Sequence, residues 1–294
     1  MSSQGEDVCT TITAGKLLRQ RIEAGGFILA PGVHDGFSAR IALEVGFDVL
    51  YMTVAGVTAS VHGCADLGIA TLNDMRRSAE MIASLSPFTP VIADADTRYG
   101  GPIMVARAVE QYSRSGVGAL HIEDQVQTKR CVHLAGKVLV DLKEYLACIR
   151  AAVQARRRIG SDIVIIARTD SIQKHGYEEA LARLRAARDA GADAAFPEGL
   201  RSVEEARRMI ADLAPWPALL NMVENSVTPK ISAKEAKGLG FSMMIVPLAT
   251  LAPAYTAIEA GLQKLKETGL ADTELTPQVK IQISAPESSN LILQ

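Results

Sequence analysis

Short apolar runs rich in β-branched residues recur along the chain and alternate with longer stretches of helical period. The runs predict eight strands, at 27–33, 49–54, 90–95, 119–123, 163–168, 194–198, 218–223 and 243–247. The intervals between them carry amphipathic patterns such as MVARAVEQYSRSG, which predict helices. Several of these helices are followed by glycine where a left-handed C-cap is expected, at Gly46, Gly116, Gly191 and Gly240.

Strands that alternate with helices predict right-handed βαβ units and a parallel sheet. Eight such units within 294 residues predict a (β/α)8 TIM barrel. A doubly wound open sheet is the alternative, but no GxGxxG follows the first strand. We expect an N-terminal arm at 1–14, the barrel at 15–251, and a helical extension with a polar tail at 252–294. The extension indicates a homodimer or homotetramer, with a disordered tail as the alternative for its end.

Composition excludes some partners. Hydrophobic residues make up 48% of the chain and the net charge is −2, with acids and bases interspersed, so we expect neither nucleic-acid nor membrane binding. No apolar run approaches the roughly 20 residues that span a bilayer, and the N-terminus resembles no signal peptide. The four cysteines lack CxxC spacing, which suits a reducing compartment. We therefore expect a cytoplasmic protein.

Acidic side chains gather where the predicted strands end, which is the active-site face of a barrel. The segment VIADADTRYGG ends an apolar run with Asp94 and Asp96, which resist desolvation unless a partner compensates their charge. The other strand-end residues are His34, Asp35, Tyr51, Thr53, Glu123, Asp124, Arg168, Asp170, Glu198, Asn221 and Glu224. This oxygen-rich set suits Mg²⁺ or Mn²⁺, and the lack of a lysine argues against a Schiff-base aldolase. Helix caps or a solvated rim are the alternative interpretation.

A polar loop at 124–137 follows the fourth strand and carries Lys129, Arg130, Cys131 and His133. Positive neighbours depress the pKa of a thiol, so Cys131 is a candidate proton donor or acceptor on a lid. An incidental thiol is the alternative. His121 lies inside a predicted strand and is interpreted as a satisfied core histidine.

Five separated motifs carry a family resemblance. DADTRYGG, HIEDQ, KRCVH, IIARTDS and LLNMVE resemble the isocitrate lyase/phosphoenolpyruvate mutase superfamily over about residues 15–270. LAGKVLVD, ARTDS and GPIMVAR are most similar to its fungal 2,3-dimethylmalate lyase and oxaloacetate hydrolase branch. The resemblance implies a Mg²⁺- or Mn²⁺-dependent barrel that makes or breaks a C–C bond next to an α-keto acid.

The same resemblance implies roles for individual residues. Asp94 would contact the metal, and its waters would be held by Asp66, Asp96 and Glu123. Arg168 would neutralise the substrate oxygen, and Cys131 would protonate the enolate or aci-carboxylate. The remaining substrate contacts would come from Glu198, Asn221, Tyr51, Thr53 and His133. The terminal helix would be swapped between the subunits of a tetramer.

Three glycines of the family pattern are replaced in the pocket, by Val54, Arg98 and Val132. Side chains at such points block the approach of backbone amides to an anion. Two readings stay open: an ordinary lyase of a 2-substituted malate-type acid, or a repurposed member that acts on a different substrate in secondary metabolism. A non-catalytic homologue is a third. Pro247 stands where the related hydrolases are expected to carry serine, which favours C–C cleavage over hydrolysis.

Overall fold

The computed structural model describes residues 12–128, 136–224 and 226–271, and it divides into two compact units, Met1–Leu251 and Ala252–Gln294. The first unit contains all eight strands. The second contains most of a single long helix, α11 (Leu251–Thr268), in which no residue is buried. Among the described residues, no helix is long and apolar enough to cross a membrane.

All eight predicted strands form, and they are parallel. They are β1 (Ile28–Val33), β2 (Leu50–Met52), β3 (Val91–Asp94), β4 (Ala119–Ile122), β5 (Val164–Thr169), β6 (Ala194–Pro197), β7 (Leu219–Asn221) and β8 (Met243–Val246). Their order is β6-β5-β4-β3-β2-β1-β8-β7, and a parallel bridge between Ala195 and Ala218 joins the two outer strands. The sheet therefore closes into a barrel, and the predicted (β/α)8 fold is confirmed, whereas the helix swap stays a prediction.

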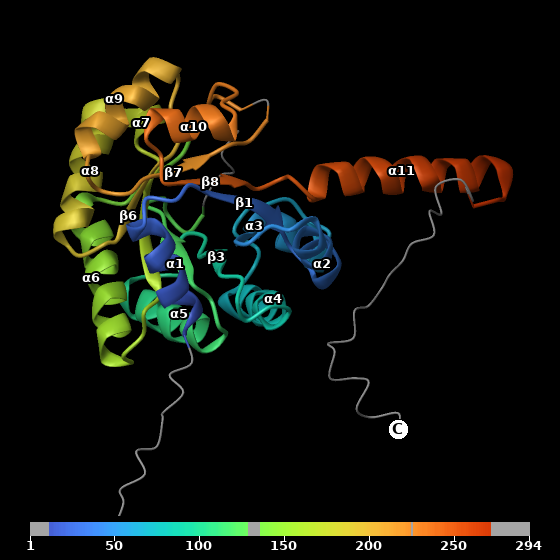
Figure 1. Ribbon diagram of the computed structural model, residues 1–294, viewed down its shortest axis with the longest axis horizontal. Coiled ribbons are helices and arrows are strands. Elements are labelled where there is room, and N and C mark those ends of the chain that lie inside the picture. The colour runs from blue at the N-terminus through green and yellow to red at the C-terminus, as the bar shows by residue number, and fades with distance from the viewer. Residues whose placement is uncertain (1–11, 129–135, 225, 272–294) are drawn as a thin grey trace, which may run out of the picture. The chain divides into compact units, whose positions relative to one another are not determined.

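Helices surround the strands of the first unit (Figure 1). They are α1 (Ala14–Glu23), α2 (Gly36–Val45), α3 (Val54–Val57), the π-helix η1 (Thr58–His62), α4 (Leu72–Ser84), α5 (Pro102–Arg114), α6 (Leu142–Arg158), α7 (Ile172–His175), α8 (Tyr177–Asp189), α9 (Val203–Leu213) and α10 (Ala233–Leu239). The four glycines predicted to end helices all have positive φ, from 81° to 102°. At the other ends, side-chain caps satisfy free backbone N–H groups, as in the Thr71–Asp74 capping box of α4.

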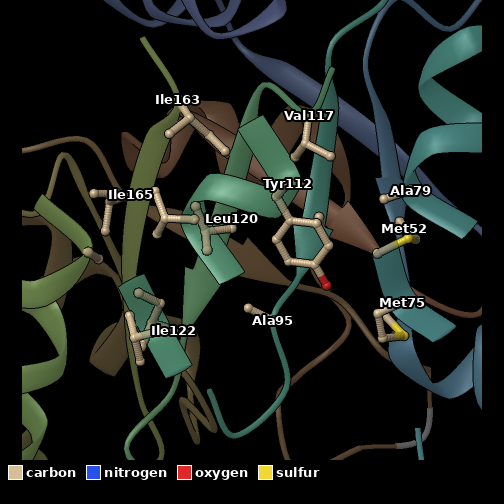
Figure 2. Close-up of a cluster of buried hydrophobic side chains, with 14 of the residues drawn as sticks. Met52, Met75, Ala79, Ala95, Tyr112, Val117, Leu120, Ile122, Ile163 and Ile165 are labelled. Atoms are coloured by element: carbon tan, nitrogen blue, oxygen red, sulfur yellow. The ribbon is translucent and has the colours of Figure 1, made fainter. Parts of the chain in front are cut away.

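Two hydrophobic clusters fill the space between strands and helices, and a third fills the barrel. In the cluster around β3 to β5, the Tyr112 ring of α5 lies among aliphatic and methionine side chains (Figure 2). Its hydroxyl group donates a 2.9 Å hydrogen bond to the backbone carbonyl of Asp94. The core thus anchors the end of the strand that carries the first predicted metal ligand.

Strand alternation determines which side chains enter the barrel. The interior cluster contains Ile92 of β3, Ala119 of β4, Ile166 of β5 and Ala194 of β6. Side chains two residues apart in a strand share a face. The inward positions that follow towards the C-terminal ends are Asp94, His121, Arg168 and Phe196. An apolar floor therefore carries a polar layer at the mouth of the barrel.

Candidate active site

Asp94 and Asp96 with Tyr51 and His121 form what we call the acidic cluster. The Tyr51 hydroxyl donates to Oδ2 of Asp94 at 2.9 Å, and the backbone N–H of Asp96 donates to Oδ1 at 2.8 Å. His121 Nε2 lies 3.0 Å from the Tyr51 oxygen and 3.4 Å from Asp94 Oδ1. His121 is fully buried and hydrogen-bonded, as predicted for a satisfied core histidine, and its ring also contacts the candidate metal ligand.

Negative charge accumulates at this cluster. Asp94 and Asp96 are both buried, at 4% and 2% exposure. Burial, followed by the charge of Asp94, raises the pKa of Tyr51 well above its ordinary value, and the charge of Asp66 contributes in the same direction. Tyr51 therefore remains a protonated donor at neutral pH, and the electrostatic field of the site favours a cation.

The loop after β3 has an unusual backbone. Asp96, Arg98 and Tyr99 have φ of 49°, 74° and 57°, in the left-handed region, and Gly100 follows with φ of 136°. Each non-glycine residue there costs roughly 1–2 kcal/mol. Hydrogen bonds compensate: Arg98 N–H donates to the carbonyl of Ala95 at 2.9 Å, and the Tyr99 and Tyr112 hydroxyls lie 2.7 Å apart. Strained backbone conformations that the surrounding hydrogen bonds stabilise in this way are typical of functional loops.

Arg98, which replaces a glycine of the family pattern, adopts the left-handed conformation, and its side chain is buried. The guanidinium donates to the carbonyl of Gln125 at 2.9 Å and lies 3.7 Å both from Cys148 Sγ and from Glu144 of α6. These contacts link the loop to α6. Val54, at the start of α3, is buried within the hydrophobic cluster outside the strands.

A second group at the ends of β4 and β5 consists of ion pairs, and we call it the ion-pair cluster. Its members are Arg168, Asp170, Lys137, Asp124 and Arg183. Arg168 donates to both carboxylate oxygens of Asp170, at 2.9 and 3.0 Å, and its Nε lies 3.2 Å from Glu123. Lys137 Nζ lies 2.5 Å from the same Asp170. The mouth therefore contains a buried lysine that strand-end reading missed, since Lys137 lies in the loop.

Charge pairing sets the protonation of this cluster. Burial works against the charge of Arg168, but Asp170, Glu123 and Glu198 outweigh it and raise the pKa of the guanidinium. Burial likewise disfavours ionised Asp170, yet Arg168 and Lys137 hold its pKa below the ordinary value. Both groups are charged at neutral pH, and Lys137 is committed to an ion pair rather than free as a nucleophilic amine.

Glu198 and Asn221 meet on the other side of the mouth. Asn221 Nδ2 donates to Glu198 Oε2 at 3.0 Å, and both residues are buried. Asn221 Oδ1 is buried without a hydrogen-bond partner among the described residues, and so is Gln125 Oε1 beside Glu123. These open polar atoms indicate that the mouth holds a polar ligand.

Thr53 and the tip of β8 complete the described rim. Thr53 is buried, precedes α3, and donates its N–H to the carbonyl of Val33 at 3.2 Å. The tip of β8 passes so close to β1 that a Cβ added to Gly32 would lie 2.0 Å from the carbonyl oxygen of Pro247. Cys131, Val132 and His133 lie outside the described residues.

The donor set fits a magnesium or manganese ion that retains waters. Across the described ranges, no group of three His, Cys, Asp or Glu side chains forms a cage of protein ligands alone. Mg²⁺ does not need one, because it commonly takes one or two carboxylates and keeps several waters. Buried Asp94, Asp96 and Glu123, with half-buried Asp66 near Tyr51, supply carboxylate oxygens, the ligand atoms that Mg²⁺ prefers.

Comparison with known proteins places the chain among acid-cleaving enzymes. A family model described as phosphoenolpyruvate phosphomutase matches residues 18–266. The 2,3-dimethylmalate lyase of Eubacterium barkeri is 37% identical over 268 residues, which are 90% of this chain and 91% of that protein.

Solved structures of related enzymes also resemble the chain. A crystal structure of 2,3-dimethylmalate lyase, described as a PEP mutase/isocitrate lyase superfamily member, is 64% identical, with a TM-score of 0.91 over 96% of this chain and 94% of that one. Oxaloacetate acetylhydrolase in complex with the inhibitor 3,3-difluorooxalacetate is 56% identical, with a TM-score of 0.88 over 91% of this chain and 90% of that one.

Proposed function

The chain belongs to the phosphoenolpyruvate phosphomutase family, within the PEP mutase/isocitrate lyase superfamily, and from that premise we propose that it is a Mg²⁺-dependent carbon–carbon lyase of a 2-substituted malate-type acid. One observation carries the proposal: a buried acidic cluster faces a buried arginine across a mouth with open polar atoms. The likeness to 2,3-dimethylmalate lyases supports the substrate class.

Asp94 is the proposed metal contact, with Asp66, Asp96 and Glu123 holding the metal's waters. A bound Mg²⁺ or Mn²⁺ supplies positive charge to the oxygens whose charge changes during cleavage. Tyr51 and the Asp96 backbone fix the orientation of the Asp94 carboxylate, because each donates to a different oxygen. His121 packs against Tyr51, with ring centroids 5.9 Å apart, and keeps that phenol in place.

Arg168, Glu198 and Asn221 are the proposed binding groups for the organic acid. Arg168 is charged at neutral pH, and a guanidinium suits a carboxylate or carbonyl oxygen. Asn221 Oδ1 accepts a donor such as a hydroxyl group. Thr53 and His133 complete the contacts to the keto-acid half.

Cys131 is the proposed general acid. When the C2–C3 bond of the malate breaks, its electron pair stays on C3, the carbon next to the second carboxylate. The hydroxyl group at C2 gives its proton to solvent and becomes the keto oxygen. A proton from Cys131 Sγ to C3 completes the second product, so one substrate yields an α-keto acid and a carboxylic acid.

Contacts of the replaced positions favour the ordinary-lyase reading over the remodelled pocket. Arg98 is bound to Gln125 and α6, and Val54 is part of the hydrophobic cluster, so both side chains have partners away from the proposed substrate. Val132 lies outside the described residues. The repurposed enzyme and the non-catalytic homologue become alternative outcomes of the test below.

Steady-state turnover of 2,3-dimethylmalate, 2-methylisocitrate and oxaloacetate by the full chain tests the proposal. We expect keto-acid release from at least one of the two malate-type acids, with 2,3-dimethylmalate first. Activity should disappear with EDTA and return with Mg²⁺ or Mn²⁺. A variant with glycine at positions 54, 98 and 132 is the matched comparison. Turnover by that variant alone would support the remodelled pocket, whereas metal binding without any turnover would support the non-catalytic homologue.

We also infer that the protein is a cytoplasmic homodimer or homotetramer assembled through α11. Tyr255, Ile258, Leu262 and Leu265 form an exposed apolar row at helical spacing on α11. A second exposed row, Phe37, Ile41 and Val45, runs along α2. Leu262→Lys should lower the mass found by light scattering at micromolar concentration, while Gln263→Lys should not. A monomeric wild type would contradict this inference.

A further inference from the structure

Lys137 is buried at the mouth, and the proposed reaction has no direct use for it. Its side chain is only 4% exposed, and a lysine this buried is rare unless a partner compensates its charge. That partner is Asp170, whose side chain is fully buried and which also binds Arg168 through both carboxylate oxygens. One carboxylate therefore lies between two cations.

Asp170 itself has little freedom to move. Its backbone N–H donates to Asp124 Oδ1 at 2.9 Å. Asp124 in turn accepts from the Thr169 hydroxyl at 2.6 Å and from Arg183 at 3.1 Å. The backbone of Asp170 is thus fixed from behind, and Lys137 contacts the carboxylate from another element.

The backbone on either side of Lys137 is also held. Gln125 and Leu139 form an antiparallel bridge, Val126 N–H donates to Val138 at 2.9 Å, and Val140 N–H donates to Asp124 at 2.9 Å. Lys137 lies next to this paired segment. Its ammonium group therefore approaches Asp170 from a backbone that is itself hydrogen-bonded to the end of β4.

The contacts of Asp170 explain what the lysine adds. Arg168 binds both carboxylate oxygens of Asp170, at 2.9 and 3.0 Å, so the orientation of the guanidinium follows that of the carboxylate. Lys137 contacts Oδ1 of the same carboxylate from the loop and restricts its rotation. Without Lys137, the carboxylate and the guanidinium that it binds would be freer to turn.

We propose that Lys137 is a positioning residue that, through Asp170, fixes the orientation of the Arg168 guanidinium for the substrate. This inference rests on the proposed function only for its catalytic consequence. Its geometric part, restriction of Arg168, holds whichever acid the protein cleaves.

Lys137→Met, which keeps the aliphatic stem and removes the charge, tests the inference beside Lys137→Arg, which keeps the charge. Lys143→Met, on the exposed side of α6, is the matched control. Nitrogen-15 NMR follows rotation of the Arg168 guanidinium, with its signals assigned by their loss in Arg168→Lys. Separate Nη signals are expected in wild type, Lys137→Arg and Lys143→Met, and averaged signals in Lys137→Met.

Turnover of 2,3-dimethylmalate supplies the second readout. Misplacement of a catalytic contact by about 1 Å costs roughly 10²-fold, so kcat of Lys137→Met should fall by about 10-fold to 10²-fold with a smaller change in KM. Lys137→Arg should recover most of the loss. Lys137→Gln replaces the methionine variant if circular dichroism shows that the latter is unfolded.

Unchanged, slow guanidinium rotation in the folded neutral variant would overturn the inference, and so would a loss of Tm without any change in kcat or in the Arg168 signals. A wild type that cleaves none of the acids would refute the proposed function instead, and the NMR result would still decide the role of Lys137.

Discussion

The two clusters at the mouth of the barrel hold buried carboxylates in different ways. In the acidic cluster, a phenol and a backbone N–H bind Asp94, and an imidazole lies beside it. In the ion-pair cluster, a guanidinium and an ammonium group bind Asp170. The first arrangement orients a carboxylate through hydrogen bonds, whereas the second pairs a carboxylate with two cations. The first suits a carboxylate that contacts a metal ion, and the second suits the orientation of a cationic side chain.

This difference gives the mouth two electrostatic halves. Positive charge stabilises an organic dianion, and a divalent cation bound at the acidic half would supply it there. The ion-pair half supplies it through Arg168. The substitutions that follow perturb one half at a time.

Asp94→Ala should have the largest effect. Loss of the metal contact removes several kcal/mol of charge stabilisation, equivalent to a fall in turnover of at least about 10³-fold. Isothermal titration should detect no Mg²⁺ binding, while Tm changes little, because the side chain lies at the mouth. Asp48→Ala, at an exposed acid, is the control. Unchanged Mg²⁺ affinity in Asp94→Ala would show that the metal, if bound, has another ligand.

Asp170→Asn should lower the free energy of unfolding by about 3–5 kcal/mol, because it leaves two buried cations without their carboxylate. The folded-state pKa of Asp170 is lowered, mainly by Arg168 and then Lys137 against the opposing effect of burial. Its stabilisation is therefore complete above the unfolded-state pKa of about 3.9 and is lost as pH falls below it.

Urea unfolding at pH 7 and at successively lower pH measures the free energy of unfolding of wild type and Asp170→Asn. The difference between the two free energies should become smaller as the pH falls. Exposed Asp189→Asn is the control. A difference in the free energy of unfolding that grows towards low pH would contradict the assigned ion pairs.

Cys131→Ser should lower kcat by about 10²-fold if the thiol is the general acid, in the range typical of proton transfer. Its residual activity should still require Mg²⁺, because the acidic cluster is intact. Cys64→Ser, at an exposed cysteine, is the control. Equal turnover by the two serine variants would show that Cys131 is not the general acid.

Arg98→Gly and Arg98→Ala should have the smallest effects. Both lose the hydrogen bonds to Gln125 and Thr97, at roughly 1–3 kcal/mol, but glycine also relieves about 1 kcal/mol of left-handed strain. The free energy of unfolding in urea should therefore be highest for wild type, lower for Arg98→Gly and lowest for Arg98→Ala. Turnover by both variants should stay within a few fold of wild type. A large gain in turnover by Arg98→Gly would favour the remodelled pocket.

The fold could be predicted because each element carries a local signal. Apolar runs correspond to the eight strands within one or two residues at nearly every end, and the predicted glycine C-caps adopt positive φ. Both signals are intrinsic to the backbone and to alternating burial, so they need no knowledge of tertiary contacts. Whether α11 mediates assembly depends on a second molecule, so oligomerisation through α11 stays a prediction.

Prediction of the candidate site was only partial, for two physical reasons. The strand-end rule found Asp94 and Arg168, because inward alternation brings both to the mouth. It gave His121 no functional role, since a histidine within a strand has the same pattern whether it packs or hydrogen-bonds. It also missed Lys137, whose burial depends on a long-range ion pair that sequence spacing does not encode. Neither the left-handed φ of Arg98 nor the direction of its side chain towards α6 was predicted from the sequence.

The bridge between Gln125 and Leu139 has a consequence for how this enzyme class can diversify. Because Gln125 pairs with Leu139 and both flanking segments are hydrogen-bonded to each other, the described ends of the loop are fixed at β4. Chimeras that exchange residues 127–136 between relatives and keep the proposed Cys131 and His133 should therefore retain the register of the barrel and the position of Lys137. Such chimeras offer laboratory evolution a way to search for new acids.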